Sequence, residues 1–153
     1  LVGMAGPVAF YVWRDARAIE TRARDLLFPA LEVPETSEKA TFLLFLASEG
    51  LGLPEASRQA LALLSARAQP GRWALLGRAI EAARAPAAGV EDVERAFGIA
   101  VRVRPAGADG AWAHLFRADW LESIDRTDAA RFDLEAARAV DALAALPGKE
   151  TGR

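Results

Sequence analysis

His114, the only histidine of the chain, is the residue best suited to chemistry. An imidazole can serve as a general base or a metal ligand near neutral pH, particularly when a carboxylate orients it. Asp119 and Asp125 follow it closely. The alternating pattern around His114 predicts a β-strand, however, and both aspartates would lie beyond its end. We interpret His114 as an edge-strand residue and the aspartates as capping residues, with a small enzyme centred on His114 as an alternative.

The motifs that usually accompany catalysis are missing. The chain contains no H-E-x-x-H, no G-x-S-x-G, no Walker loop and no dinucleotide-binding fingerprint. It also contains no cysteine, which excludes thiolate chemistry, disulfides and metal sites that need cysteine ligands. We therefore predict a protein that is not an enzyme, with no catalytic residue and no cofactor, and we identify no small-molecule substrate.

An acidic stretch near the C-terminus is the other candidate for chemistry, because clustered carboxylates can bind calcium or magnesium. Its members are Asp119, Glu122, Asp125, Asp128, Asp133 and Glu135. A calcium loop also needs a glycine-bearing turn with ligands at alternate positions, and the stretch lacks one. We interpret the carboxylates as a solvated acidic face with charges at helix N-termini, and we predict no metal site.

Arg102 and Arg104 are candidates for nucleic-acid contacts. They fall in a predicted hairpin that follows several helices, which is the element order of a winged helix-turn-helix. The third helix should then present basic side chains on one face, but its arginines are spaced six apart, at Arg72, Arg78 and Arg84. The net charge of −2 and the pI of about 5.5 also disfavour a dedicated nucleic-acid binder. A winged-helix-like DNA-binding regulator remains an alternative.

Two of the four tryptophans, Trp112 and Trp120, flank the predicted hairpin and are the best candidates for a partner surface. Aromatic side chains are enriched at the energetic centres of protein interfaces. The alternative is that both indoles pack the hairpin onto the helices.

The first thirteen residues are uncharged and end in an aromatic cluster followed by arginines, a pattern typical of a helix leaving a membrane on its cytoplasmic side. Thirteen residues are too few to span, since about 20 are needed. The chain begins with Leu, and the coding sequence upstream would decide whether a spanning helix is completed there. The residues expected to anchor the protein to a membrane or a partner are Val8, Phe10, Tyr11, Val12, Trp13, Arg14 and Arg17.

The elements that position these residues are mainly helical. We predict an apolar N-terminal helix over residues 1–30, a single helical domain over 36–147 and a flexible tail over 148–153. The domain has four to six helices, because apolar residues recur at helical spacing between Pro and Gly breakers. The segment 40–47 is apolar on every side, which is typical of a central helix covered by its neighbours.

Two further details of the domain are predicted. Ile99, Val101 and Val103 alternate with other residues, so we expect a β-hairpin near residues 99–117 with its turn at 105–110. The last helix should face inward with a stripe of apolar residues, namely Phe132, Ala136, Val140 and Leu143.

These observations favour a non-catalytic accessory or adaptor subunit that acts through protein–protein interaction. Arginine replaces lysine at all basic positions except Lys39 and Lys149, and alanine is abundant, which is typical of a GC-rich bacterial genome. We expect a cytoplasmic, cysteine-free protein at the inner face of the cytoplasmic membrane. Its expected partners are proteins, with membrane contact through residues 1–17 and nucleic acid disfavoured.

Overall fold

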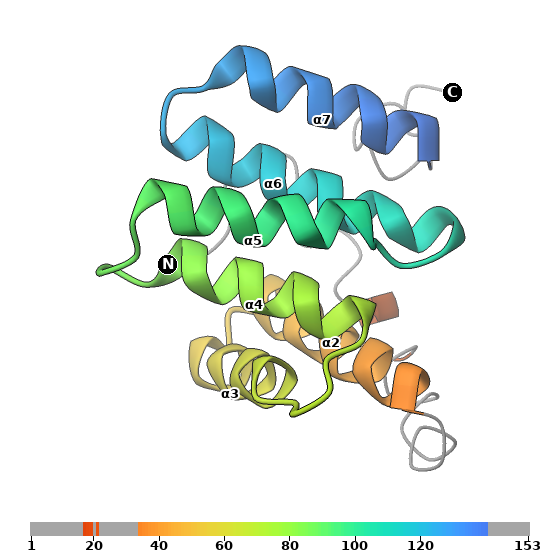
Figure 1. Ribbon diagram of the computed structural model, residues 1–153. Coiled ribbons are helices and arrows are strands. Elements are labelled where there is room, and N and C mark those ends of the chain that lie inside the picture. The colour runs from red at the N-terminus through yellow and green to blue at the C-terminus, as the bar shows by residue number, and fades with distance from the viewer. Residues whose placement is uncertain (1–16, 20, 22–33, 141–153) are drawn as a thin grey trace.

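The computed structural model describes residues 17–19, 21 and 34–140, and these parts of the chain are helices joined by short turns (Figure 1). The prediction of a mainly α-helical protein is confirmed. The helices of the continuous range are α2 (Pro34–Gly50), α3 (Pro54–Ser65), α4 (Arg72–Arg84), α5 (Val90–Arg102), the 3-10 helix η2 (Gly107–Gly110), α6 (Ala111–Ser123) and α7 (Thr127–Val140). Residues 17–19 and 21 are also helical, and Ile19 packs against the core. The predicted tail over 148–153 lies outside the described residues.

The helices form three hairpins that stack on one another. α2 packs most extensively against α3, α4 against α5, and α6 against α7. The connections are short, as expected for antiparallel neighbours. In Figure 1 the stack runs from α2 and α3 at the bottom to α7 at the top. α7 therefore lies at one end of the stack, where α6 and η2 provide its main contacts.

Phe42 of α2 lies at the centre of the core. Its ring centroid is 4.9 Å from that of Trp73 in α4, and 5.9 Å and 6.3 Å from those of Phe116 and Trp112 in α6. Such aromatic pairs contribute about 0.5–1.5 kcal/mol beyond the burial of their surface. The cluster thereby joins one helix from each hairpin. The segment 40–47, expected to be central, supplies much of this core: Ala40, Phe42, Leu43, Phe45, Leu46 and Ala47 are buried.

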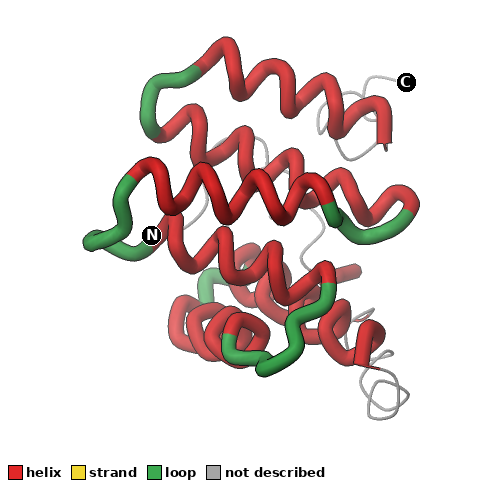
Figure 2. The backbone as a smooth tube through the Cα atoms, in the orientation of Figure 1, coloured by secondary structure: helices red, strands yellow, loops and turns green. Residues whose placement is uncertain are grey.

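The predicted β-hairpin over residues 99–117 is wrong. Residues 99–102 continue α5, residues 111–117 begin α6, and η2 lies between them. Figure 2 accordingly contains only helix and loop in the part of the chain that is described.

Packing explains why α5 continues through the apparent strand. Val93, Phe97 and Ala100 recur at helical spacing and are buried, and the ring of Phe97 stacks on Trp120 at 5.7 Å. Gly98 lies within α5. Glycine inside a helix costs about 1 kcal/mol relative to alanine, which is less than the gain from burying Phe97 alone.

The strand-like pattern of α6 has a different cause. Large and small residues alternate along its first turns, but almost every residue is buried, because α4, α5 and α7 all contact this helix. A helix covered on several sides shows no polar stripe, so its periodicity is uninformative.

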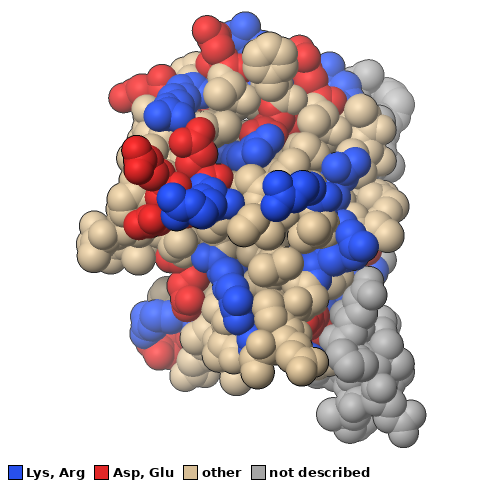
Figure 3. Space-filling view, in the orientation of Figure 1, with Lys and Arg blue, Asp and Glu red and all other residues tan. Residues whose placement is uncertain are grey.

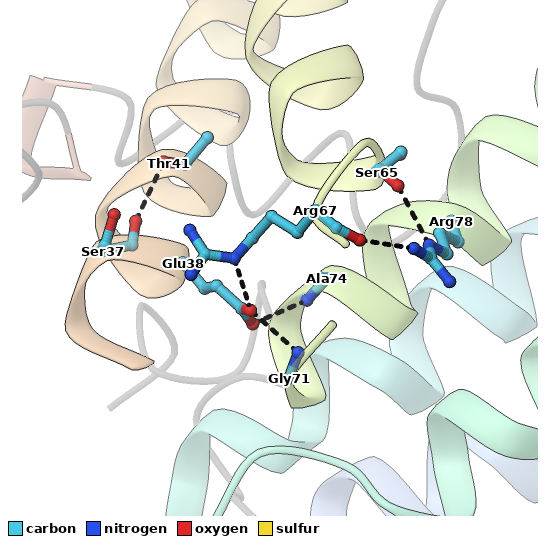
Figure 4. Close-up of polar contacts among 8 residues, drawn as sticks. All are labelled: Ser37, Glu38, Thr41, Ser65, Arg67, Gly71, Ala74 and Arg78. Atoms are coloured by element: carbon cyan, nitrogen blue, oxygen red, sulfur yellow. Dashed lines mark hydrogen bonds and ion pairs between the residues drawn. The ribbon is translucent and has the colours of Figure 1, made fainter. Parts of the chain in front are cut away.

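The carboxylate of Glu38 in α2 caps the N-terminus of α4 (Figure 4). Its oxygens accept hydrogen bonds from the backbone N–H groups of Gly71 at 2.8 Å and Ala74 at 3.0 Å. Arg67 forms an ion pair with the same carboxylate at 2.9 Å. The first N–H groups of a helix lack partners within the helix, and the helix dipole favours a negative charge there. Glu38 is buried, and its negative charge is balanced by the N–H groups at the start of α4 and by the guanidinium of Arg67.

Arginine side chains satisfy the C-termini of two helices. Arg78 donates hydrogen bonds to the carbonyl oxygens of Ser65 at 3.0 Å and Arg67 at 2.6 Å, at the end of α3 (Figure 4). Arg72 donates to the carbonyl oxygens of Val103 and Arg104, at 3.0 and 3.1 Å, after the end of α5. These carbonyl groups have no partner within their own helices. Arg72 and Arg78 of α4 thus serve as structural caps.

A second carboxylate, that of Glu49 at the end of α2, joins the first two hairpins. Arg84 of α4 donates to both of its oxygens, at 3.1 and 3.2 Å. Ser57 of α3 donates its hydroxyl hydrogen to the same carboxylate. The guanidinium of Arg84 also lies 5.2 Å from the ring centre of Phe45, within the range of a cation–π interaction. Glu49 therefore joins α2, α3 and α4.

We predict that Gly71→Ala destabilises the protein. A Cβ at this position would lie 2.7 Å from Oε1 of Glu38, and that buried carboxylate cannot move without losing its bonds to α4. We expect the free energy of unfolding, measured by urea denaturation, to fall by roughly 1–3 kcal/mol.

Gly98→Ala is the matched control. Nothing lies within 4 Å of a Cβ at position 98, and this residue is inside α5. Alanine should raise the free energy of unfolding by roughly 0.5–1 kcal/mol. Equal effects of the two substitutions would contradict the assigned role of Glu38.

Candidate functional site

His114 lies on α6 and pairs with Asp133 of α7. The distance from His114 Nδ1 to Asp133 Oδ1 is 3.0 Å. Arg117 donates to the same carboxylate, from Nε to Oδ2 at 2.7 Å and from a terminal nitrogen to Oδ1 at 2.8 Å. His114 and Arg117 are one turn apart on α6, so both reach the same group on α7. The sequence suggested Asp119 and Asp125 as the acids near His114, but the residue that pairs with it is Asp133.

The electrostatics of this cluster keep Asp133 ionised. Burial by itself raises the pKa of Asp133, but hydrogen bonds from His114 and Arg117, together with the charge of Arg117, hold the pKa below the usual value of 3.8. An ionised carboxylate can only accept hydrogen bonds, so Nδ1 of His114 is the donor. The tautomer and the orientation of the ring are thereby fixed.

A His–Asp pair is also the acid–base part of a catalytic triad, but a general base must reach the proton that it removes. His114 is 6% exposed and Asp133 is 2% exposed. The two hollows described below do not include His114 in their lining. The prediction of an edge-strand histidine is wrong, since His114 is a buried helical residue that joins α6 to α7.

The residues of the acidic stretch differ in burial and in position. Asp133 is buried, Asp119 is half-buried in α6, and Asp125 occupies the turn after α6 with a φ of 62°. Asp125 thereby adopts the left-handed conformation that ends many helices. Within residues 17–19, 21 and 34–140, no group of three or more His, Asp or Glu side chains could hold a metal ion.

Trp112 and Trp120, the predicted partner surface, are both 8% exposed. Trp112 belongs to the aromatic cluster around Phe42, and Trp120 stacks on Phe97. Their indole rings pack α6 against α2 and α5, and residues 99–117 form no β-hairpin for them to hold.

Arg102 and Arg104, the alternative nucleic-acid contacts, lie at the C-terminal end of α5. With Arg72 they line an open hollow of about 540 Å³. Arg72 is already bonded to two carbonyl oxygens, and the helix dipole favours positive charge at this end of α5. On the face drawn in Figure 3, acidic side chains gather where α5 begins and basic ones where it ends. The helix dipole thus favours Arg102 at its position, and Arg72 is held by its hydrogen bonds.

A second hollow, of about 200 Å³, lies between α4, α5 and α6. Its floor is formed by aromatic rings, including those of Phe97, Phe116 and Trp120. Sites for small-molecule ligands usually measure about 300–1,000 Å³. This hollow is therefore small for a metabolite or cofactor.

The exterior of α7 carries an apolar surface that the described helices cover only in part, since Ala129 and Ala136 are half-buried whereas Phe132 and Ala139 are exposed. The buried face of α7 consists of Ala130, Asp133 and Ala137. A second group, here called the α7 stripe, follows the helix at spacings of three and four residues and consists of Ala129, Phe132, Ala136 and Ala139. Phe132 is 74% exposed, the highest value among the exposed large hydrophobic residues of the described chain. Beside the stripe run charged residues, namely Asp128, Arg131, Glu135 and Arg138.

The predicted inward stripe of the last helix is therefore wrong for its main member, Phe132. The inward position of Phe132 was predicted because Phe132, Ala136, Val140 and Leu143 recur on one face of the helix. The pairing of Asp133 with His114 and Arg117 instead turns the neighbouring face inward. Leu143, the last member of the predicted stripe, lies outside the described residues.

Of the residues predicted to form the anchor, the structure describes only Arg17. Val8, Phe10, Tyr11, Val12, Trp13 and Arg14 lie outside the described residues, whereas Arg17 is exposed and helical. Among the helices that the structure describes, none has both the length and the apolar character to cross a membrane.

Comparisons of the chain with protein-family models, curated proteins and solved structures gave no match.

We predict that Asp133→Asn weakens the acid dependence of stability. The pKa of Asp133 is lower in the folded than in the unfolded chain, so its ionised form stabilises the fold above about pH 4. That contribution disappears as the pH falls through the folded pKa. The wild-type chain should lose stability more steeply than Asp133→Asn below pH 4, and the variant should be roughly 2–4 kcal/mol less stable at pH 7.

Urea denaturation at a series of pH values measures both effects. Asp128→Asn is the control, because Asp128 lies on the same helix with a side chain that is 93% exposed. Identical pH profiles for wild type and Asp133→Asn would show that the carboxylate contributes nothing to the fold.

Proposed function

We propose that this chain is a non-catalytic accessory or adaptor subunit of a bacterial complex, and that it binds protein through the α7 stripe. The observation that carries the proposal is the 74% exposure of Phe132 on a helix whose other large side chains are packed or charged. Burying such a ring against a partner contributes about 1.5–3 kcal/mol. The mixed charges beside the stripe would form the polar rim that surrounds most interface cores.

The acidic side chains between the helices form structural ion pairs, which supports the non-catalytic part of the proposal. Glu38, Glu49 and Asp133 each bond to groups from another helix, with an arginine among their partners. Residues that hold helices together in this way are already committed to the fold. The alternative of an enzyme centred on His114 draws no support from a side chain so deeply enclosed.

The DNA-binding alternative depended on a β-hairpin wing that carries Arg102 and Arg104. Arg102 is instead the last residue of α5, and Arg104 lies just after the end of that helix. We therefore retain protein binding as the proposed activity.

We further propose that residues 1–17 attach the protein to the inner face of the cytoplasmic membrane or to an apolar partner. The support is the sequence pattern, an uncharged segment that ends in Tyr11 and Trp13 and continues into Arg14 and Arg17. A short apolar segment with aromatic and basic residues binds at an interface without spanning.

Affinity capture from the native host tests the role of the α7 stripe. We expect at least one protein to be enriched with wild-type bait and to fall at least tenfold with Phe132→Glu, because the charge cannot be buried at the centre of an interface. Leu63→Glu is the matched control, since Leu63 on α3 is 71% exposed and lies on the hairpin farthest from α7. Identical capture by all three baits would contradict the proposal.

Vesicle flotation tests the anchor. Wild-type protein should float with vesicles that contain anionic lipid, and Val8→Asp with Val12→Asp should leave it in the soluble fraction. The double variant Arg102→Ala with Arg104→Ala should float like wild type, because these arginines are remote in sequence from the anchor. Flotation that is equal for all three proteins, or absent with wild type, would contradict membrane attachment through residues 1–17.

A further inference from the structure

We infer that the α7 stripe binds the α7 stripe of a second copy of this chain, with the two helices antiparallel. This inference rests on the proposed protein-binding function and names the partner. It follows from two patterns along α7, the order of large and small residues and the order of charges.

The sizes of the stripe residues are complementary in an antiparallel pair. When a two-fold axis passes beside residue 134, Phe132 of each copy faces Ala136 of the other, and Ala129 faces Ala139. The large ring thus meets a small residue at each crossing, which lets the two helices approach closely. In a parallel pair Phe132 would meet its own copy, and the alanines on either side would leave gaps.

The charges beside the stripe select the same orientation. From the start of α7 their signs alternate, negative at Asp128, positive at Arg131, negative at Glu135 and positive at Arg138. An antiparallel copy places the two charged flanks on the same side of the interface and in reverse order, so charges of opposite sign meet. In a parallel pair the two flanks lie on opposite sides of the interface and do not meet. Exposed pairs add little affinity, but they favour the antiparallel orientation.

The geometry of α7 leaves room for the second copy. α7 is at the end of the stack, and its contacts with α6 use the face of Ala130, Asp133 and Ala137. Docking of a second α7 would place α6 and α7 of both copies in one four-helix arrangement. The 14 residues of α7 span about 21 Å at 1.5 Å per residue. A single helix face of this length is small beside the ~1,200 Å² of a stable standard interface, so the dimer should be weak and reversible.

Sedimentation equilibrium of the full chain over roughly 1–300 µM measures the association. We expect a reversible monomer–dimer equilibrium for wild type, at least tenfold weaker association for Phe132→Glu, and unchanged association for Leu63→Glu. Circular dichroism and urea denaturation verify that the variants fold. A wild-type chain that is monomeric throughout this range, or folded Phe132→Glu that dimerises like wild type, would overturn the inference.

Cysteine cross-linking tests the orientation, because the natural chain has no cysteine. Asp128→Cys and Arg138→Cys are prepared as separate full-length proteins. Under mild oxidation an antiparallel pair should cross-link the mixture as a heterodimer, while each protein alone stays largely uncross-linked, since the two positions are about 15 Å apart along the helix. Efficient cross-linking of each protein with itself, and no preference for the mixed product, would overturn the antiparallel arrangement.

The outcomes separate this inference from the proposed function. A monomeric wild type whose captured partner still depends on Phe132 would exclude the second copy and leave the adaptor role in place. A dimer sensitive to Phe132, with capture of other proteins unaffected by Phe132→Glu, would support the second copy and refute the adaptor role of the α7 stripe.

Discussion

The aromatic cluster around Phe42 is the interaction on which the rest of the structure depends. It joins α2, α4 and α6, one helix from each hairpin, through rings whose centroids lie within 6.3 Å of Phe42. A helical hairpin alone cannot bury its apolar face, so the hairpins are stable only when stacked. The cluster provides this stacking, and the outer helices α3, α5 and α7 pack around it.

Buried and half-buried carboxylates give the stack its specific geometry. Glu38 binds the start of α4, Glu49 joins the first two hairpins, and Asp133 joins α6 to α7. Hydrophobic burial is not directional, whereas a hydrogen-bonded charge accepts only one arrangement of its donors. These three residues therefore determine how each helix is rotated. For α7 that rotation decides the function that we propose, because placing Asp133 inside leaves Phe132 outside.

Many of the arginine side chains stabilise helix ends or pair with acidic residues. The excess of arginine over lysine is typical of a GC-rich genome, but several of the arginines have definite structural contacts. Arg72 and Arg78 satisfy the carbonyl groups that end α5 and α3, and Arg84 and Arg117 pair with buried acids. The planar guanidinium suits these bidentate and multiple contacts better than an ammonium group does. Basic residues that suggested nucleic acid from their sequence therefore also have a structural explanation.

The sequence by itself determined the helical class and the central position of residues 40–47, because apolar spacing and Pro or Gly breakers act locally. It could not decide residues 99–117, where a helix buried on several sides loses its polar stripe and imitates a strand. Nor could it show that His114 meets Asp133, since this contact depends on how α6 and α7 pack. Only the tertiary structure decided which face of α7 is buried, because a hydrogen-bonded carboxylate turned inward displaced the more hydrophobic Phe132 to the surface.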